Sequence, residues 1–449
     1  MRLFAEITES VDTQLGFVAE RAKRDKSATF DNLMHLVNEE SLTAGYWLLQ
    51  KECAAGVDGV SWKEYGEYLE ENIKGLMGRL KTMSYRPQAV RRVYIPKDNG
   101  ELRPIGIPAM EDKVVQKTMS RIMEAIYEQD FYEDSYGFRP GRGCHQALKR
   151  INDLITLGSI CYVIEADIKG FFDNVEHDKL MEWLGVRIRD EKFRRYVVRF
   201  LKAGYMEQEA FKRTSTGTPQ GGNISPMLAN VFLHYVVDEW FEKKIKPRMK
   251  GKGNVVRYCD DFVILTQYKE AEGILRELKY RLAINGLMVN EKKTRLISFG
   301  RFEKENARKQ NRRPNTFDFL GITHYISTTS AGKFTVGRRT SRKRMRGSCL
   351  ALKRWMVKVR SAMPLKQWWE ELATKMKGHY AYYGISDNTD GIHAYYAIVV
   401  RMAYKWINRR SQRASMNWEE YWAYLKLHPL PKPRIMYQLY IPKRCKAHC

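Results

Sequence analysis

The sequence predicts an α+β fold, with antiparallel strands in the middle of the chain and helices on both sides of them. Two β-branched and aromatic runs flank Asp260 and Asp261, which is typical of a hairpin with the acids at its turn. A second hairpin is indicated by Asn99-Gly100, a pair that favours tight turns. Apolar residues recur at helical spacing in residues 1–85 and again from 347 to about 410.

The N-terminal third is expected to be helical, then stranded, then helical again. Residues 1–85 form helices around a turn at 56–59, and strands alternate over residues 86–110 on both sides of the Asn-Gly turn. Lys97 and Arg103 flank this turn, a position where cations are commonly just solvated.

Helices are expected over residues 111–160, interrupted by a loop at 137–143 that is rich in Gly, Pro and Arg. Small residues let a backbone approach a ligand closely, so Arg139 and Arg142 are candidates for contacts with nucleic-acid phosphates.

A third acid ends the apolar strand predicted at Tyr162–Asp167. Beside the hairpin, Asp167 would join Asp260 and Asp261 in a cluster of three carboxylates. Such carboxylates repel each other and need a counter-charge, and Mg²⁺ is a hard cation that prefers oxygen ligands. Two Mg²⁺ ions in such a cluster drive in-line phosphoryl transfer. A solvated Asp-Asp turn is the alternative, since Asp is common in turns.

A Gly-rich loop at residues 217–226 lies between these acids and precedes a helix expected from Met227 to Trp240. Further helices are expected over residues 178–201 and 270–286, the second ended by Gly286. Residues 300–315 are charged and rich in Pro and Asn, which indicates a surface insertion.

The C-terminal part begins with a basic run that favours a contact with an RNA or DNA backbone. Its cations are Arg338, Arg339, Arg342, Lys343, Arg344 and Arg346. The aromatic residues of the following helices suit base stacking and a hydrophobic core equally well. Residues 411–449 are basic and Pro-rich.

Composition favours a polyanionic partner. The 78 Lys and Arg exceed the 52 Asp and Glu and give a net charge of +26, which points to nucleic acid first. A membrane surface is the weaker alternative, because no stretch reaches the roughly 20 apolar residues of a spanning helix. Seven scattered cysteines without a signal peptide are typical of free thiols in a reducing cytoplasm, and the tail Cys445–Cys449 lacks a second pair of zinc ligands.

The order of these blocks resembles a group II intron reverse transcriptase–maturase of the bacterial type, over nearly the whole chain. Residues 162–173, 217–226 and 257–265 resemble the palm of that family. Further stretches match it at residues 55–59, 94–97, 103–108, 135–142, 290–294, 319–321 and 377–384.

The resemblance implies a right-hand polymerase, in which fingers and palm carry an antiparallel sheet and a helical thumb follows. Residues 1–85 would be an N-terminal extension with the start of the fingers, and 86–330 the fingers and palm. Residues 331–410 would be the thumb/maturase domain, and 411–449 a basic DNA-binding segment. The nuclease domain of many relatives is not expected.

The resemblance also implies roles for individual residues. Asp167 and Asp260 would be the principal ligands of two Mg²⁺ ions, assisted by Asp261 and the carbonyl of Ile168. The incoming dNTP would contact Lys97, Arg103, Phe172, which excludes the 2′ hydroxyl, and Gln220. Lys293, or Lys292 beside it, would act on the pyrophosphate, and Phe319 and Gly321 would belong to the primer grip. Cys259 stands where the family usually has Ala, so a thiol sensitive to oxidation is expected beside the metals.

The function implied is RNA-directed DNA synthesis combined with splicing assistance, in the bacterial cytoplasm. The expected partners are a group II intron RNA, a target DNA, an RNA template with a DNA primer, and dNTPs, with no membrane. Two alternatives stay open: a splicing factor that keeps the polymerase only as a scaffold, and a reverse transcriptase used in repair or in acquiring foreign sequence.

Overall fold

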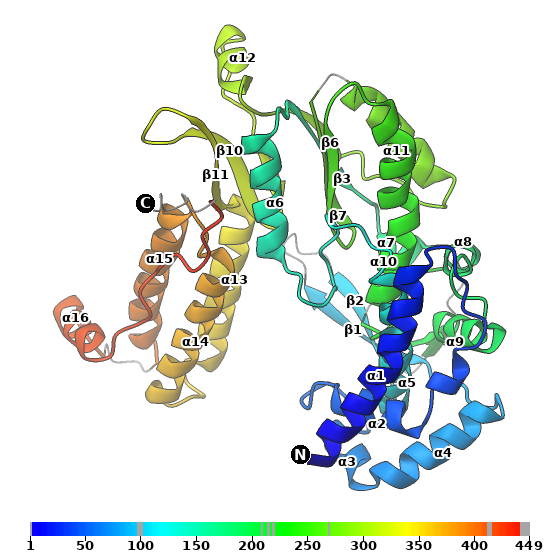
Figure 1. Ribbon diagram of the computed structural model, residues 1–449. Helices are drawn as coiled ribbons and strands as arrows, with labels where there is room; N and C mark the ends of the chain where they lie inside the picture. Colours follow the sequence, from blue (N-terminus) through cyan, green and yellow to red (C-terminus); the bar gives the residue numbers. More distant parts are fainter. Residues whose placement is uncertain are drawn as a thin grey trace, which may run out of the picture.

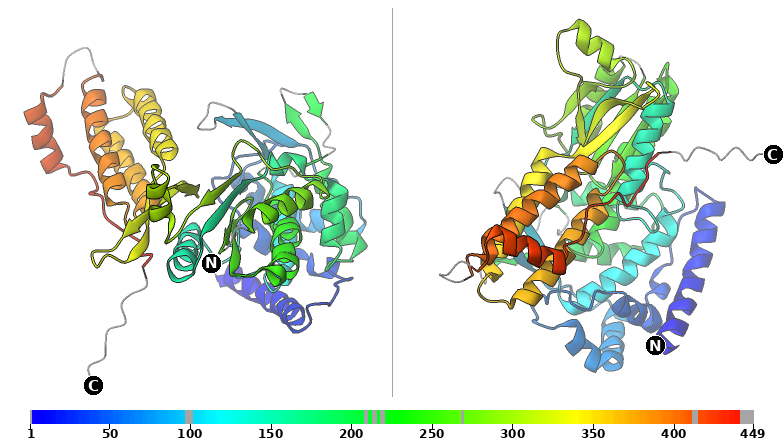
Figure 2. Two further views of the ribbon diagram at one scale, coloured as in Figure 1. Left: turned by 90° about the horizontal axis from the view of Figure 1, so that it is seen from above. Right: turned by 90° about the vertical axis from the view of Figure 1, so that its left-hand side faces the viewer.

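The computed structural model describes residues 2–96, 102–207, 210–212, 216–217, 221–267, 270–410 and 415–440, with side chains from residue 6 onward. Three sheets and their surrounding helices confirm the expected α+β class with antiparallel sheets and a helical C-terminal region. The helices between residues 2 and 127 lie at one end of the molecule and those between residues 342 and 427 at the other, with the central strands between them (Figure 1 and Figure 2).

The central sheet has the strand order β6-β7-β3-β8, and all neighbouring strands are antiparallel. Its strands are β3 (Tyr162–Asp167), β6 (Gly253–Tyr258), β7 (Asp261–Thr266) and β8 (Arg295–Ser298). Because side chains alternate between the faces of a strand, Ile164 and Ala166 point to one face of the sheet. Glu165 and Asp167 point to the opposite face. The helices described next pack against the face of Ile164 and Ala166, so the acids lie on the other side of the sheet.

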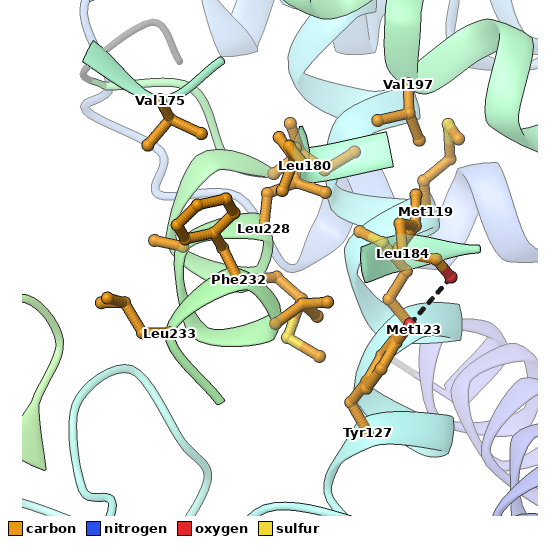
Figure 3. Close-up of a cluster of buried hydrophobic side chains, with 14 of the residues drawn as sticks. Met119, Met123, Tyr127, Val175, Leu180, Leu184, Val197, Leu228, Phe232 and Leu233 are labelled. Carbon is orange, nitrogen blue, oxygen red and sulfur yellow. Dashed lines mark hydrogen bonds between the residues drawn. The ribbon is translucent and has the colours of Figure 1, made fainter. Parts of the chain in front are cut away.

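Helices cover the first face and form one hydrophobic cluster with it. They are α5 (Met110–Tyr127), α8 (His177–Leu184), α9 (Glu191–Leu201), α10 (Ser225–Leu233) and α11 (Ala271–Ala283). Figure 3 shows Met123 of α5 beside Leu184 of α8, and Leu180 beside Leu228 of α10. The hydroxyl of Tyr127 donates to the Leu184 carbonyl at 3.1 Å, which fixes α5 against α8.

The N-terminal helices extend the same cluster, as the helical spacing predicts. They are α1 (Arg2–Arg24), α2 (Glu39–Trp47), α3 (Trp62–Glu67) and α4 (Leu69–Lys81). Asn38 and Ser61 cap α2 and α3 through capping boxes, so both helix starts have satisfied N–H groups.

A second sheet contains the hairpin expected around the Asn-Gly turn. Strands β1 (Val90–Pro96) and β2 (Leu102–Ile107) pair antiparallel, and the turn itself lies outside the described residues. The short strands β4 (Tyr205–Glu207) and β5 (Ala210–Lys212) complete the order β2-β1-β4-β5.

The third sheet joins the body to the C-terminal helices. It consists of β9 (Phe317–Phe319), β10 (Ile322–Thr328) and β11 (Phe334–Thr340), in the order β11-β10-β9. Since β10 and β11 pair along their whole length, a domain boundary at residue 330 would separate the strands of one hairpin. Helices α13 (Arg342–Val359), α14 (Leu365–Tyr383) and α15 (Thr389–Ile407) follow.

A second hydrophobic cluster fills the space between these helices, α6 (Cys144–Leu157) and the other face of the central sheet. Val163, Val263 and Leu265 belong to it, and so do the aromatic residues of α14. The last described residues also pack here. After α16 (Trp418–Leu427), Tyr437 forms a bridge with Ile385 and stacks on His145 of α6 at 3.8 Å.

Two stretches differ in detail from the expected pattern. The helix expected to end at Trp240 is α-helical only to Leu233 and continues as a π-helix over His234–Glu239. The insertion at 300–315 contains a helix, α12 (Glu303–Lys309), where Arg312 pairs with the buried Glu303 at 2.5 Å. Among the described helices, none has the length and apolar character needed to cross a bilayer.

Candidate active site

The three predicted acids meet at one end of the central sheet. Asp167 is the last residue of β3 and pairs in register with Asp261, the first residue of β7. Asp260 follows Cys259 in the two-residue turn between β6 and β7. Opposite residues of antiparallel strands have Cβ atoms about 4.5–5.5 Å apart. The structure thus brings together the carboxylates that the sequence predicts to cluster.

The acidic turn is held from behind by the loop that precedes α6. The Tyr136 N–H donates to the Arg257 carbonyl at 2.8 Å, and a Cβ on Gly137 would lie 2.4 Å from the Cys259 nitrogen. Only glycine permits this approach. Cys259, the residue that precedes Asp260, has a positive φ of 58° and therefore adopts a left-handed backbone conformation in the hairpin turn.

A buried ion pair fixes the strand that carries this turn. Arg257 is 0% exposed, and its Nη2 lies 2.5 Å from Oδ2 of Asp238 in the π-helical segment. The same guanidinium donates to the Asn230 side chain at 3.0 Å and to the Cys259 carbonyl at 3.1 Å. Asn230 in turn donates to the Gly137 carbonyl at 2.7 Å, which ties the loop, helix and turn together.

Burial raises the pKa of both acids of the hairpin turn, Asp260 and Asp261, and neighbouring carboxylates add to the rise. Burial raises the pKa of Asp261 to about 6, and repulsion by Asp260 and Asp167 contributes, while Arg344 and Lys293 oppose the rise. Asp261 is exposed to solvent at the start of β7, although many protein atoms lie around its carboxyl group. Burial likewise raises the pKa of Asp260, where Asp167 adds repulsion and Arg103 opposes it.

This donor set fits a divalent cation. A cation between mutually repelling carboxylates removes the repulsion and supplies the charge that oxygen ligands favour. Among the residues that the structure describes, no three His, Cys, Asp or Glu side chains already enclose a common point at ligand distance. The carboxylate of Asp167 is instead neutralised by Lys293, whose Nζ lies 3.1 and 3.2 Å from its two oxygens.

Two of the residues predicted to contact the dNTP, Arg103 and Phe172, lie on β2 and α7 (Phe171–Asn174). Arg103 is exposed on β2 and acts electrostatically on Asp260. Phe172 lies partly buried against Phe171, with ring centroids 5.2 Å apart. A Cβ on Gly217 would lie 2.6 Å from the Phe172 carbonyl. Lys97 and Gln220 lie outside the described residues.

The sequence matches the family model "Reverse transcriptase (RNA-dependent DNA polymerase)" over residues 95–324, just over half of the chain. The chain belongs to this family. Membership implies a general dependence on divalent metal.

Relatives of this reverse transcriptase include proteins encoded by introns. It is 34% identical over 271 residues to the group II intron-encoded protein LtrA of Lactococcus lactis, covering 59% of this chain and 43% of that protein. Identity to the protein YkfC of Escherichia coli is 36%, over 48% of this chain and 64% of YkfC. A 91 kDa protein in the cob intron of Schizosaccharomyces pombe is 32% identical, over 56% of this chain and 31% of that protein. The chain therefore spans less than two thirds of each of these relatives.

On the acidic face of the reverse transcriptase sheet lies a basic cavity of about 980 Å³, between β8–β11 and the start of α13. The predicted cations Arg339, Arg342 and Lys343 line it. Arg295, Arg313 and Arg346 also line it, and Asp318 is the only acid among the described residues of its lining. Arg295 and Arg313 were not expected here, because they lie outside the basic run at 338–346 and reach the cavity only through folding.

Other predicted contacts lie inside the protein. Arg139 is buried and pairs with Glu128 at 2.8 Å, while its Nη1 donates to two carbonyls. Arg338 is 0% exposed and pairs with Asp387 at 2.5 Å. Both guanidiniums hold the fold, so the structure does not place them at a nucleic-acid surface. Arg142 is partly exposed and bonded to Glu133 at 2.9 Å.

The expected primer-grip and metal-site residues have mixed positions. Phe319 is buried in the second hydrophobic cluster, and Gly321 has φ 77° beside Arg344, to whose Cγ a Cβ would lie at 3.0 Å. Ile168 is buried and forms a bridge with Val289. Cys259 is buried too, and burial raises the pKa of its thiol, which disfavours the reactive thiolate.

Proposed function

We propose that this chain is an RNA-directed DNA polymerase of the group II intron type, which extends a DNA primer on an RNA template with dNTPs. The observation that carries the proposal is the convergence of Asp167, Asp260 and Asp261 with Lys293 and Arg103. Carboxylates that repel each other are costly to a fold, so a protein that served only as a scaffold has no use for them.

In the proposed reaction, the primer 3′ hydroxyl attacks the α-phosphorus of the dNTP and pyrophosphate leaves. Mg²⁺ ions held by Asp167, Asp260, Asp261 and the Ile168 carbonyl would acidify the hydroxyl and stabilise the departing charge. The cations of Arg103 and Lys293 lie beside these acids and suit the triphosphate and the pyrophosphate. Lys97 and Gln220 join this pocket in the proposal, and Phe172 rejects the 2′ hydroxyl by bulk.

The basic cavity supports a path for a nucleic-acid strand on the same face as the acids. Arg342, Lys343 and Arg346 come from the first turns of α13, and Arg339 precedes them on β11. A concave surface with this excess of positive charge concentrates phosphate groups and gives salt-dependent binding. Arg344, Phe319, Gly321 and Arg142 remain proposed contacts or supports of this path.

The same chain is proposed to bind a group II intron RNA, promote its splicing and copy the intron at a target DNA. Support comes from relatives whose names place them in introns and from the net charge of +26. RNA would be recognised by shape and backbone. Aromatic stacking by α14 is not part of the proposal, since Trp368, Trp369 and Tyr380 are buried.

DNA synthesis on a primed RNA template with Mg²⁺ tests the proposal, together with splicing of the intron RNA by the same preparations. The rate of DNA synthesis should fall by more than about 100-fold in the variant Asp260→Ala/Asp261→Ala. Mutation of a residue that only hydrogen-bonds to a metal ligand already lowers activity by up to about 100-fold, and these two residues would be ligands themselves. It should still promote splicing. Asp178→Ala, on the exposed face of α8, is the matched control and should behave as wild type. A wild-type protein that makes no DNA contradicts the polymerase assignment.

A further inference from the structure

Two ion pairs lie in a row on the acidic face of β3. Glu165 and Arg295 are opposite each other in the register of β3 and β8, and Nε and Nη2 of Arg295 lie 3.1 and 2.5 Å from one Glu165 oxygen. Asp167 lies two residues further along β3, and Lys293 neutralises it. Each acid of this row therefore faces its own cation.

The two cations are not equivalent. An ammonium is a compact point charge, whereas a guanidinium offers a planar fork that binds carboxylates with two parallel hydrogen bonds. A lysine can therefore be displaced from Asp167 more readily than an arginine by an incoming divalent cation. Pairing of Asp167 with an arginine would compete more strongly with metal binding.

Arg295 lies close enough to become that competitor. Residues two apart on a strand are separated by about 7 Å, and diagonal neighbours across a strand pair are within reach of long side chains. The Arg295 side chain is 54% exposed, so it has space to reorient if its partner is removed.

We propose that Glu165 is a positioning residue that retains Arg295 and thereby keeps its guanidinium away from Asp167. Asp167 is left with the ammonium of Lys293, which gives way to a divalent cation. The inference rests on the proposed role of Asp167 as a metal ligand. It assigns Glu165 a function in the reaction without contact to substrate.

Binding of Mn²⁺ to the full chain without nucleic acid tests this, measured by the electron paramagnetic resonance signal of free Mn²⁺. Four proteins form a cycle: wild type, Glu165→Gln, Arg295→Gln and the double variant. Glu165→Gln should weaken binding about five-fold, the scale of one exposed ion pair. Arg295→Gln and the double variant should stay within about two-fold of wild type, and Glu165→Asp should restore binding.

The cycle separates this role from simple loss of a nearby negative charge. If Glu165 acted only through its negative charge, Arg295→Gln would tighten Mn²⁺ binding. Glu165→Gln would then weaken binding equally with and without Arg295. Additive effects of this kind overturn the proposal, and so does unchanged binding in Glu165→Gln. Asp318 lines the cavity together with Arg295 and acts electrostatically on Glu165, so the cycle is repeated with Asp318→Asn to remove an alternative partner for Arg295.

Primer extension gives the second readout. For Glu165→Gln, the Mg²⁺ concentration at half-maximal rate should rise about five-fold. The rate at saturating Mg²⁺ should stay at the wild-type value. A changed KM for primer–template with unchanged Mn²⁺ binding overturns the proposal. Failure of wild type to polymerise would contradict the proposed function alone, because the Mn²⁺ cycle is measured without synthesis.

Discussion

The acidic turn depends on residues that have no charge. Gly137 lies against the backbone of Tyr258 and Cys259, and the positive φ of Cys259 sets the direction in which Asp260 leaves the strand. An approach of 2.4 Å to a backbone nitrogen cannot be relieved by turning a side chain, since the backbone itself would have to move.

Gly137→Ala should therefore displace the turn, at a cost of about 1–3 kcal/mol in the free energy of unfolding, the range of overpacking. DNA synthesis should fall more than stability, because the acids move with the turn. Primer extension and chemical denaturation measure the two effects. Gly143→Ala in the same loop is the control, since a Cβ there meets nothing within 4 Å and φ is −151°. Equal activity of both variants would show that the turn does not rely on this approach.

Strand β11 gives two neighbouring arginines opposite environments. Arg338 points inward, where it pairs with Asp387 and donates to Asn152 of α6 at 2.8 Å. Arg339 points outward into the basic cavity, with its guanidinium 5.4 Å from the ring centroid of Tyr325. The alternation of a strand thus separates a structural cation from one that faces the proposed nucleic-acid path.

Substitution of each arginine by Met should separate stability from binding. Arg338→Met removes the cation that pairs with Asp387, which keeps a hydrogen bond from the Tyr440 hydroxyl, and should lower the free energy of unfolding by about 3 kcal/mol. Arg339→Met should leave stability unchanged but weaken primer–template binding and reduce its salt dependence by about one phosphate contact. Denaturation and binding at several salt concentrations measure both, and the opposite pattern would contradict the placement of the two side chains.

Features that depend on residues close together in the sequence could be predicted from it. The acids, the hairpin around them and the helical regions could be predicted from alternation and turn residues. The inward position of Arg338 could not, because it depends on pairing with β10 and on Asn152, 186 residues earlier in the chain. Arg139 was misplaced for a different reason: a Gly-rich loop suggests a ligand, whereas the arginine pairs with Glu128 at the C-terminal end of α5, 11 residues earlier.

The molecule as a whole buries several histidines in their neutral form. Burial lowers the pKa of His234 and His324 to about 3, and that of His379 to about 4. The lowered values favour the folded state above the unfolded pKa of about 6.5. This stabilisation is lost as pH falls from about 6.5 towards 3, because the unfolded chain binds protons that the folded chain refuses.

Thermal stability should therefore decline from pH 6.5 to pH 4. His324→Phe should flatten this decline, because Phe keeps the stacking on Phe317 at the His324 position, where centroids lie 4.6 Å apart, and removes one titrating group. Between pH 6.5 and pH 4 this group contributes about 3 kcal/mol to the decline. Calorimetry at a series of pH values measures it, with His35→Phe on the surface helix η1 (Met34–Leu36) as the control. Parallel curves for wild type and His324→Phe would contradict the assignment.

The second hydrophobic cluster bears on how the gene can be divided. Val163, Val263 and Leu265, on the same face of the central sheet as the acids, share one core with Trp368, Leu372 and Tyr383 of α14. A fragment that ends after the matched polymerase region would expose this apolar face to water and invite aggregation. Swapping the C-terminal helices between relatives would likewise require the strands beneath them to be exchanged, so recombination that preserves activity must respect this shared core.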